Sequence, residues 1–159
     1  MKKTQIQTFI KRVLPQRFPE YRVKFIPHKE VSPCSAQVIK KKNKYVIELS
    51  RQDFIYQLES TEIKSLLLHE LGHIATSNPT SWKGNTTAKE EYKAQMWAIR
   101  IASKKGLQRI VKELIDVFRT WAEFDWNQDR GEFRRYILAS RIFTYHNPAG
   151  RKINKVSGK

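Results

Sequence analysis

The chain has 159 residues and a formal net charge of +16, with 40% hydrophobic and 29% charged residues. This length excludes two full catalytic domains, since a single core typically serves about 100 to 200 residues. The composition is that of a globular chain without the roughly 18 consecutive apolar residues of a membrane span, so we expect no membrane contact. Polar and basic residues interrupt what would be the apolar part of a signal peptide, and the single cysteine, Cys34, cannot form an intramolecular disulfide, so we expect a cytoplasmic protein.

The positive charge is concentrated at the two ends of the chain. Residues 1–44 hold 12 Lys or Arg against 2 acids, residues 45–127 hold 11 against 11, and residues 128–159 hold 8 against 2. Such a chain is attracted to polyanions through the release of counterions, whatever its fold. Contact with nucleic acid through the basic termini is one interpretation, and a solvated basic surface is the other, because no nucleic-acid motif of defined spacing accompanies the charge.

A helix and a small sheet are predicted for the first fifty residues. Apolar residues at positions 6, 9, 10, 13 and 14 form one stripe at helical spacing that ends at Pro15. Residues 21–26 alternate in polarity as a strand does, and residues 36–39 and 45–49 flank a Lys-Lys-Asn-Lys turn typical of a hairpin. We expect these strands to form a small antiparallel sheet.

Two long helices are predicted to follow the sheet. Ser60 or Thr61 can cap the first of them, which should end before Pro79. Thr87 and Glu90 have the spacing of a capping box at the start of the second helix, whose end is marked by a Lys-Lys-Gly sequence at residues 104–106.

The remainder of the chain is predicted to contain two further helices and a tail. Amphipathic patterns cover residues 107–118 and 132–143. Residues 147–159 have almost no apolar content and are expected to form a flexible basic tail. The elements together predict an α+β fold in a single domain over residues 1–146, with the antiparallel sheet packed on the first long helix.

A metal-binding pattern lies in the middle of that first long helix. His69, Glu70 and His73 form H-E-x-x-H, and residues four apart lie one above the other on a helix face, so both imidazoles can reach one ion. Tetrahedral zinc accepts such nitrogens, and Glu70 would lie close enough to act on a water molecule at the metal without being a ligand. The alternative, two histidines with no metal, would leave an isolated buried pair unsatisfied.

A third ligand is needed, and the acids of the next helix are the best candidates. His28 and His146 lie far from the pattern along the chain. Helical geometry places Glu91 in the middle of a stripe of three alanines, which would let this helix pack closely against the histidine helix. Glu90 is the alternative, but as the capping partner of Thr87 it should point toward the helix start. Without a metal, both acids would be first-turn residues favoured by the helix dipole.

The motifs resemble those of a known family. The sequence HELGHIA at residues 69–75 is preceded by YVIELS and STEIKSLLL and followed by EYKAQMWA at residues 91–98. Over about residues 45–102 the chain resembles the ImmA/IrrE group of small gluzincin metallopeptidases. The family pattern usually has Asn and Phe where this chain has Gln95 and Trp97.

The resemblance implies a zincin-like fold and a role for each motif residue. It implies zinc held by His69, His73 and Glu91, with Glu70 activating water. It also implies a zinc-dependent endopeptidase that cleaves a repressor-like regulatory protein in a bacterial, phage or mobile-element setting. The alternative is a catalytically inactive zincin-like regulator that binds a protein or nucleic acid through its basic surface, although a binding scaffold has no need of a general base such as Glu70.

Two further expectations concern the substrate. Peptide hydrolysis develops an oxyanion that a side-chain donor can stabilise, and His146 is our first candidate for this catalytic role. The alternatives are three tyrosines: Tyr92, Tyr136 and Tyr145. We also expect the strand at residues 45–49 to border the active helix and to accept an extended peptide at an open edge.

Overall fold

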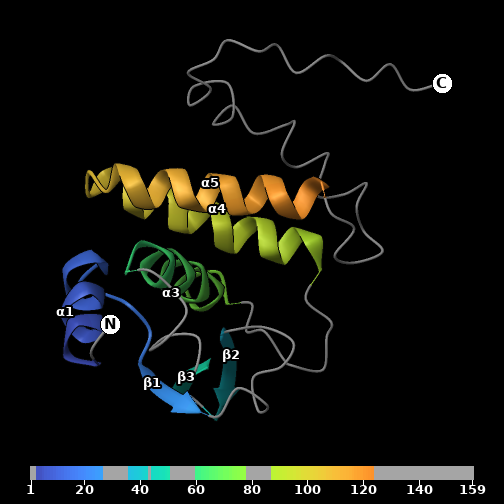
Figure 1. Cartoon of the computed structure of the whole chain (residues 1–159). Coiled ribbons are helices and arrows are strands. Elements are labelled where there is room, and N and C mark those ends of the chain that lie inside the picture. The colour runs from blue at the N-terminus through green and yellow to red at the C-terminus, as the bar shows by residue number, and fades with distance from the viewer. Residues whose placement is uncertain (1–2, 27–35, 43, 51–59, 78–86, 124–159) are drawn as a thin grey trace.

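The computed structural model describes residues 3–26, 36–42, 44–50, 60–77 and 87–123. In chain order the elements are α1 (Lys3–Val13), β1 (Tyr21–Ile26), β2 (Ala36–Lys41), β3 (Lys44–Ser50), α3 (Ser60–Ala75), α4 (Ala88–Lys104) and α5 (Gln108–Glu123) (Figure 1). The α+β class expected from the sequence is confirmed for this part of the chain. The helix expected at residues 132–143 and the tail expected at 147–159 lie outside the described residues.

Helix α4 begins and ends where its local sequence predicts. The backbone N–H of Thr87 donates to Oε2 of Glu90 at 2.8 Å, and the backbone N–H of Glu90 donates to Oγ1 of Thr87 at 3.3 Å, which completes the capping box. After the helix, Gly106 has a φ of 68°, a left-handed conformation that glycine adopts without steric cost. The cap therefore fixes the first turn of α4, on which Glu90 and Glu91 both lie.

The sheet is mixed, so the antiparallel expectation is wrong for one strand. The strand order is β1-β3-β2, with β2 antiparallel and β1 parallel to β3. A short turn joins β2 to β3 and forces them to run in opposite directions. A longer connection precedes the hairpin, and alternating polarity identifies the buried face of β1 but neither its neighbour nor its direction.

Strand β3 is central, which corrects the expectation that residues 45–49 offer an open edge. It pairs with β1 along one side and with β2 along the other. Among the described strands, β2 has one neighbour and is the strand that packs most extensively against α3. The sheet edge beside the histidine helix thus belongs to β2.

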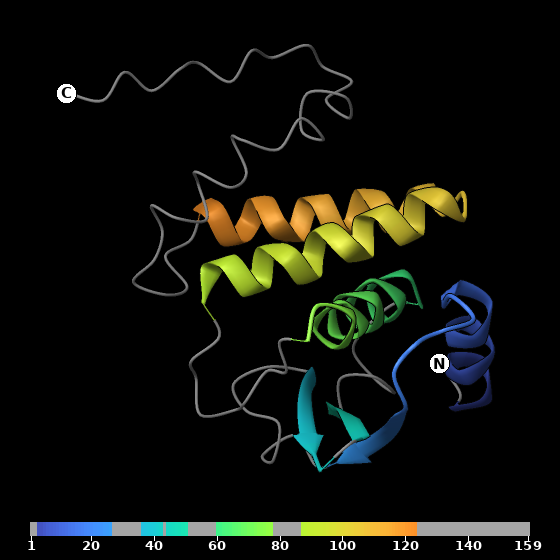
Figure 2. The same cartoon turned by 180° about the vertical axis from the view of Figure 1, so that it is seen from behind.

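Helix α3 lies between the sheet and the other long helices. Figures 1 and 2 show α4 and α5 side by side above α3, the sheet below it, and α1 beside it. Its residues Leu67, Leu68 and Leu71 are fully buried in one cluster with Ile47 and Leu49 of β3, and each such side chain contributes about 1.5–3 kcal/mol of hydrophobic stabilisation. No helix in the described ranges is both long and apolar enough to cross a bilayer.

Candidate metal centre

The two histidines of the H-E-x-x-H pattern lie on one buried face of α3. Their ring centroids are 4.7 Å apart, and the Nε2 atom of His73 lies 3.0 Å from Nε2 of His69. Both are buried, with 5% of His69 and none of His73 exposed. Their spacing of four residues, in the most enclosed helix of the described fold, brings both rings to the same point.

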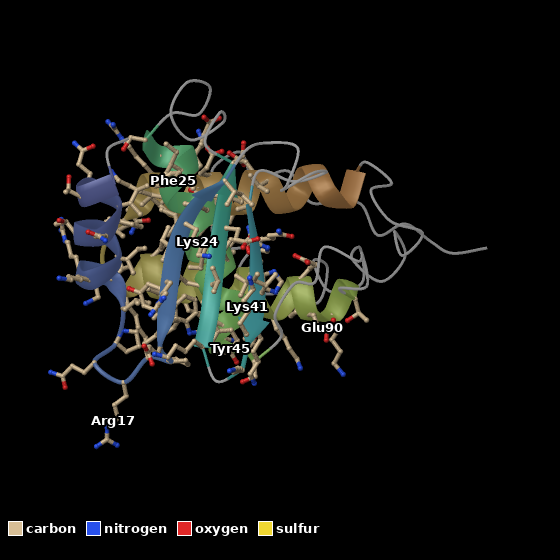
Figure 3. All side chains as sticks on the ribbon, turned by 90° about the horizontal axis from the view of Figure 1, so that it is seen from below. Arg17, Lys24, Phe25, Lys41, Tyr45 and Glu90 are labelled. Carbon is tan, nitrogen blue, oxygen red and sulfur yellow. The ribbon has the colours of Figure 1, made fainter. Side chains whose placement is uncertain are left out.

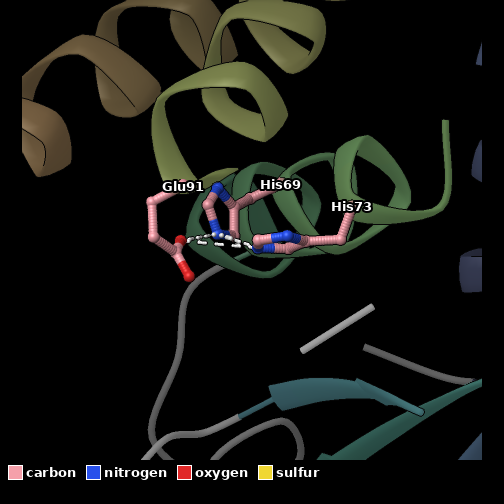
Figure 4. Close-up of side chains that lie close together, drawn as sticks. All are labelled: His69, His73 and Glu91. Carbon is pink, nitrogen blue, oxygen red and sulfur yellow. Dashed lines mark hydrogen bonds and ion pairs between the residues drawn. The ribbon is translucent and has the colours of Figure 1, made fainter. Parts of the chain in front are cut away.

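Glu91 approaches the same point from the first turn of α4 (Figure 4). Its Oε2 atom lies 3.0 Å from Nε2 of His69 and 3.4 Å from Nε2 of His73. The structure therefore brings together the three residues predicted as ligands, two from one helix and one from the next.

The donor set fits a tetrahedral metal ion in chemistry and in size. Two imidazoles and one carboxylate, with a further position left for water or substrate, form a common ligand set of catalytic zinc sites. Ligands about 2.0–2.1 Å from a tetrahedral ion lie roughly 3.3 Å from one another. The separations of 3.0, 3.0 and 3.4 Å are close to that value, so these three side chains could hold an ion with only small adjustments.

A glycine determines how closely the two ligand-bearing helices approach. A Cβ atom added to Gly72 would lie 2.3 Å from the backbone oxygen of Ala94 on α4. The expected alanine stripe is confirmed, since Ala94, Ala98 and Ala102 are all fully buried. The sequence analysis identified the alanines but not Gly72. A small residue in the middle of the H-E-x-x-H helix could have indicated a close approach of another helix.

Gln95, which the sequence analysis did not identify as functional, contacts the ring nitrogen of His69 that faces away from the cluster of ligand atoms. The Nδ1 atom of His69 lies 2.6 Å from Oε1 of Gln95. The amide Nε2 of Gln95 donates to the backbone oxygen of Leu114 on α5 at 2.5 Å. Its position in the sequence could have indicated this role, because Gln95 is a polar residue one turn after Glu91 on the same helix face.

The carboxylate of Glu91 and the ring of His69 change each other's affinity for protons. Burial favours the neutral form of Glu91, but hydrogen bonds from His69 and His73 outweigh it and hold the pKa of Glu91 well below its usual range. Burial also disfavours charge on His69, yet the hydrogen bond and negative charge of Glu91 raise its pKa overall. Protons and a metal ion therefore compete for the same ring nitrogen.

Glu70 is buried beside the ligands without being one of them. Only 4% of the residue is exposed, and its Oε2 atom has no hydrogen-bond partner among the described residues. Burial raises the pKa of Glu70, while the nearby His73 and His69 partly oppose this. A buried carboxyl oxygen without a partner is costly, and such groups occur where a carboxyl has a chemical role.

The remaining candidates have different outcomes. Glu90 is engaged in the capping box, and its carboxylate does not join the ligand cluster. Tyr92 is half-buried and packs against the core from α4. His146 and His28 lie outside the described residues, as do the two other tyrosines considered for the oxyanion, Tyr136 and Tyr145.

No family model matches this chain, and no curated protein or solved structure is significantly similar to it.

Proposed function

We propose that this protein is a zinc-dependent endopeptidase of the gluzincin type, as the resemblance to the ImmA/IrrE group implies. Three observations support the proposal: the convergence of His69, His73 and Glu91, the separation of their donor atoms, and the buried carboxyl of Glu70 beside them. The substrate class that accompanies the resemblance is a repressor-like regulatory protein.

The four residues of the site divide into metal ligands and a base in this proposal. His69, His73 and Glu91 hold the metal, which when bound polarises the scissile carbonyl and makes water more acidic. Glu70 accepts the proton of the attacking water and passes it to the leaving amine. Burial, which raises the pKa of this carboxyl, makes it a better proton acceptor than an exposed glutamate would be.

The unpartnered oxygen of Glu70 is the observation that favours catalysis over binding alone. A metal-binding scaffold without activity would be more stable with an apolar side chain at this position, because a buried oxygen without a hydrogen bond costs about 1–3 kcal/mol. Glu70 retains a carboxyl there, with its Oε2 atom lacking a partner among the described residues. We therefore prefer the peptidase to the inactive regulator.

An extended peptide substrate would pair with β2 in this proposal. Among the described strands, β2 pairs with β3 along one edge, and its other edge has no partner strand. Because β2 packs against α3, this outer edge borders the helix of His69 and His73. Backbone pairing with such an edge binds a peptide irrespective of most of its side chains. The exposed Lys40 and Lys41 on the same strand favour acidic residues in the substrate.

The first test compares two neighbouring glutamates. Glu91→Gln should weaken zinc binding more than roughly 10- to 100-fold, the effect typical of replacing a residue that only hydrogen-bonds to a ligand. The larger effect is expected because Glu91→Gln removes a charged ligand itself. Glu90→Gln is the matched control: it should retain zinc and cost about 1 kcal/mol of helix capping. Metal content after dialysis and thermal unfolding measure the two effects. Zinc lost from Glu90→Gln and kept by Glu91→Gln would show that the assigned ligand is wrong.

A second function, contact with nucleic acid, is favoured by the distribution of charge over the fold. From α1 through β3, the described residues include 10 Lys or Arg and 2 acids, whereas those from α3 through α5 include 9 and 7. Arg22, Lys24 and Lys41 are exposed and, by the alternation of the strands, lie on the sheet face opposite α3. Figure 3 views the sheet from this side, with the described helices behind or beside it.

Removing charge from this face should weaken DNA binding more than removing it elsewhere. We expect the triple variant Arg22→Gln, Lys24→Gln, Lys41→Gln to lower both the affinity and its salt dependence, with the logarithmic slope reduced by roughly 2–3. The binding of a labelled duplex at several salt concentrations provides the measurement.

The control removes the same charge from the exposed side of α4, through Lys93→Gln, Arg100→Gln and Lys104→Gln. Equal losses in both triple variants would indicate a diffuse charge effect without a nucleic-acid face. If wild-type protein binds no DNA even at low salt, the second function is wrong and the peptidase proposal is unaffected.

A further inference from the structure

We propose that Gln95 is a positioning residue that sets the orientation and tautomer of His69 and ties the metal centre to α5. The inference rests on the metal binding proposed above and assigns a role to a helix that supplies none of the three clustered ligands. Gln95 is 1% exposed and lies one turn after Glu91 on α4. It contacts His69 on α3 and Leu114 on α5, so its amide links three helices.

The partners of Gln95 determine which way its amide faces. The backbone carbonyl of Leu114 can only accept a hydrogen bond, so the amide nitrogen of Gln95 must face it. This is the arrangement in the structure. The amide oxygen then faces Nδ1 of His69 at 2.6 Å, and an amide oxygen also can only accept. It follows that Nδ1 of His69 carries a proton.

A proton on Nδ1 leaves Nε2 as the ring atom that can bind a metal. Nε2 of His69 is the atom that lies 3.0 Å from Nε2 of His73 and 3.0 Å from Oε2 of Glu91. A metal-binding histidine that donates its other N–H to a fixed acceptor is held in one orientation and becomes a stronger ligand. The carbonyl of Leu114 thus selects, through Gln95, the tautomer of His69 that suits the metal.

The length of the glutamine side chain is required because both partners must be reached at once. An asparagine at this position would be shorter by one carbon–carbon bond, about 1.5 Å, and could reach only one of them. We attribute the longer side chain of Gln95 to its tie with α5.

The test measures the zinc affinity of the full chain by competition with a chromophoric chelator. Gln95→Met keeps the length of the side chain and removes both hydrogen bonds, and we expect it to weaken zinc binding roughly 10- to 100-fold. Gln37→Met is the matched control, since Gln37 is also buried and its amide donates to Glu48 at 2.9 Å. By strand alternation Gln37 lies on the sheet face opposite α3, so its replacement should change zinc affinity by less than about twofold.

A second readout separates positioning from a general loss of stability. In zinc-loaded wild-type protein with isotope-labelled histidine, the Nδ1 proton of His69 should be visible by NMR and slow to exchange with solvent. In Gln95→Met, this proton should exchange faster, because its acceptor is gone. Gln95→Asn should bind zinc with intermediate affinity, and it replaces Gln95→Met as the test if the latter does not fold.

Three results would overturn the inference: wild-type zinc affinity in the Gln95 variant, an equal loss in Gln37→Met, or a His69 without a proton on Nδ1 in the zinc-loaded protein. If wild-type protein binds no zinc, the proposed function fails as well. If wild-type protein binds zinc and Gln95→Met binds it equally, only the role of Gln95 is wrong.

Discussion

Replacing Glu70 by Gln is expected to lower peptide hydrolysis by a factor on the order of 10² or more while zinc remains bound. The amide has nearly the size of the carboxyl and fits the same buried position, but it cannot accept a proton from water. Since Glu70 lies outside the cluster of ligand atoms, its replacement leaves the metal ligands in place. Cleavage of a library of quenched-fluorescent peptides, together with metal content and circular dichroism, measures the three properties separately.

The control for this experiment is Glu62→Gln on the same helix. Glu62 lies in the first turn of α3, two turns before His69, and is half-buried. Its replacement should leave both zinc content and cleavage near wild-type values. An unchanged cleavage rate in Glu70→Gln would rule out Glu70 as the base, even if zinc is essential for activity.

Replacing Gly72 by Ala should both destabilise the protein and weaken zinc binding. The added Cβ would lie 2.3 Å from the oxygen, 2.8 Å from the carbonyl carbon and 2.9 Å from the Cα of Ala94, all of them backbone atoms. Relief requires α3 and α4 to separate by about 1 Å, and such overpacking costs about 1–3 kcal/mol or more. Glu91 lies one turn before Ala94 and would move away from the histidines.

Gly106→Ala is the control, because it also replaces a glycine but meets no atom within 4 Å. At a φ of 68° this substitution costs about 1 kcal/mol through backbone strain alone. We expect its zinc affinity to match that of wild type. Denaturant unfolding and chelator competition measure both variants. If Gly72→Ala retains full zinc affinity, the close contact of the helices does not set the ligand distances.

The sequence predicted the parts of the fold that short-range chemistry determines. The capping box of Thr87 and Glu90, the hairpin of β2 and β3 and the spacing of His69 and His73 each depend on residues within a few positions of one another. Glu91 was identified across a longer distance because the helix period separates it from Glu90. These features require no knowledge of how the elements pack.

The features that were missed depend on contacts between distant elements. The direction of β1 is set by the strand it joins, and a single alternating segment carries no information about its neighbour. The role of Gln95 depends on a backbone carbonyl of α5, which has no signature in the sequence. The contact of Gly72 with Ala94 requires the crossing of α3 and α4, which the small residues suggest without specifying where the helices meet.

The parallel pairing of β1 with β3 imposes an order of assembly on the N-terminal half of the protein. In the hairpin, Lys41 pairs with Lys44, three positions away, whereas Tyr21 of β1 pairs with Tyr45, 24 positions away. Each doubling of loop length adds about 0.6 kcal/mol to the entropic cost of closing the loop. Pairing β1 with β3 therefore costs about 2 kcal/mol more in loop closure than forming the hairpin does. During synthesis, α1 and β1 emerge first but have no strand to join until β3 follows. The apolar face of α1 lies beside α3, which is made later still, so the first helix of the chain cannot bury this face until the sheet and α3 have followed it.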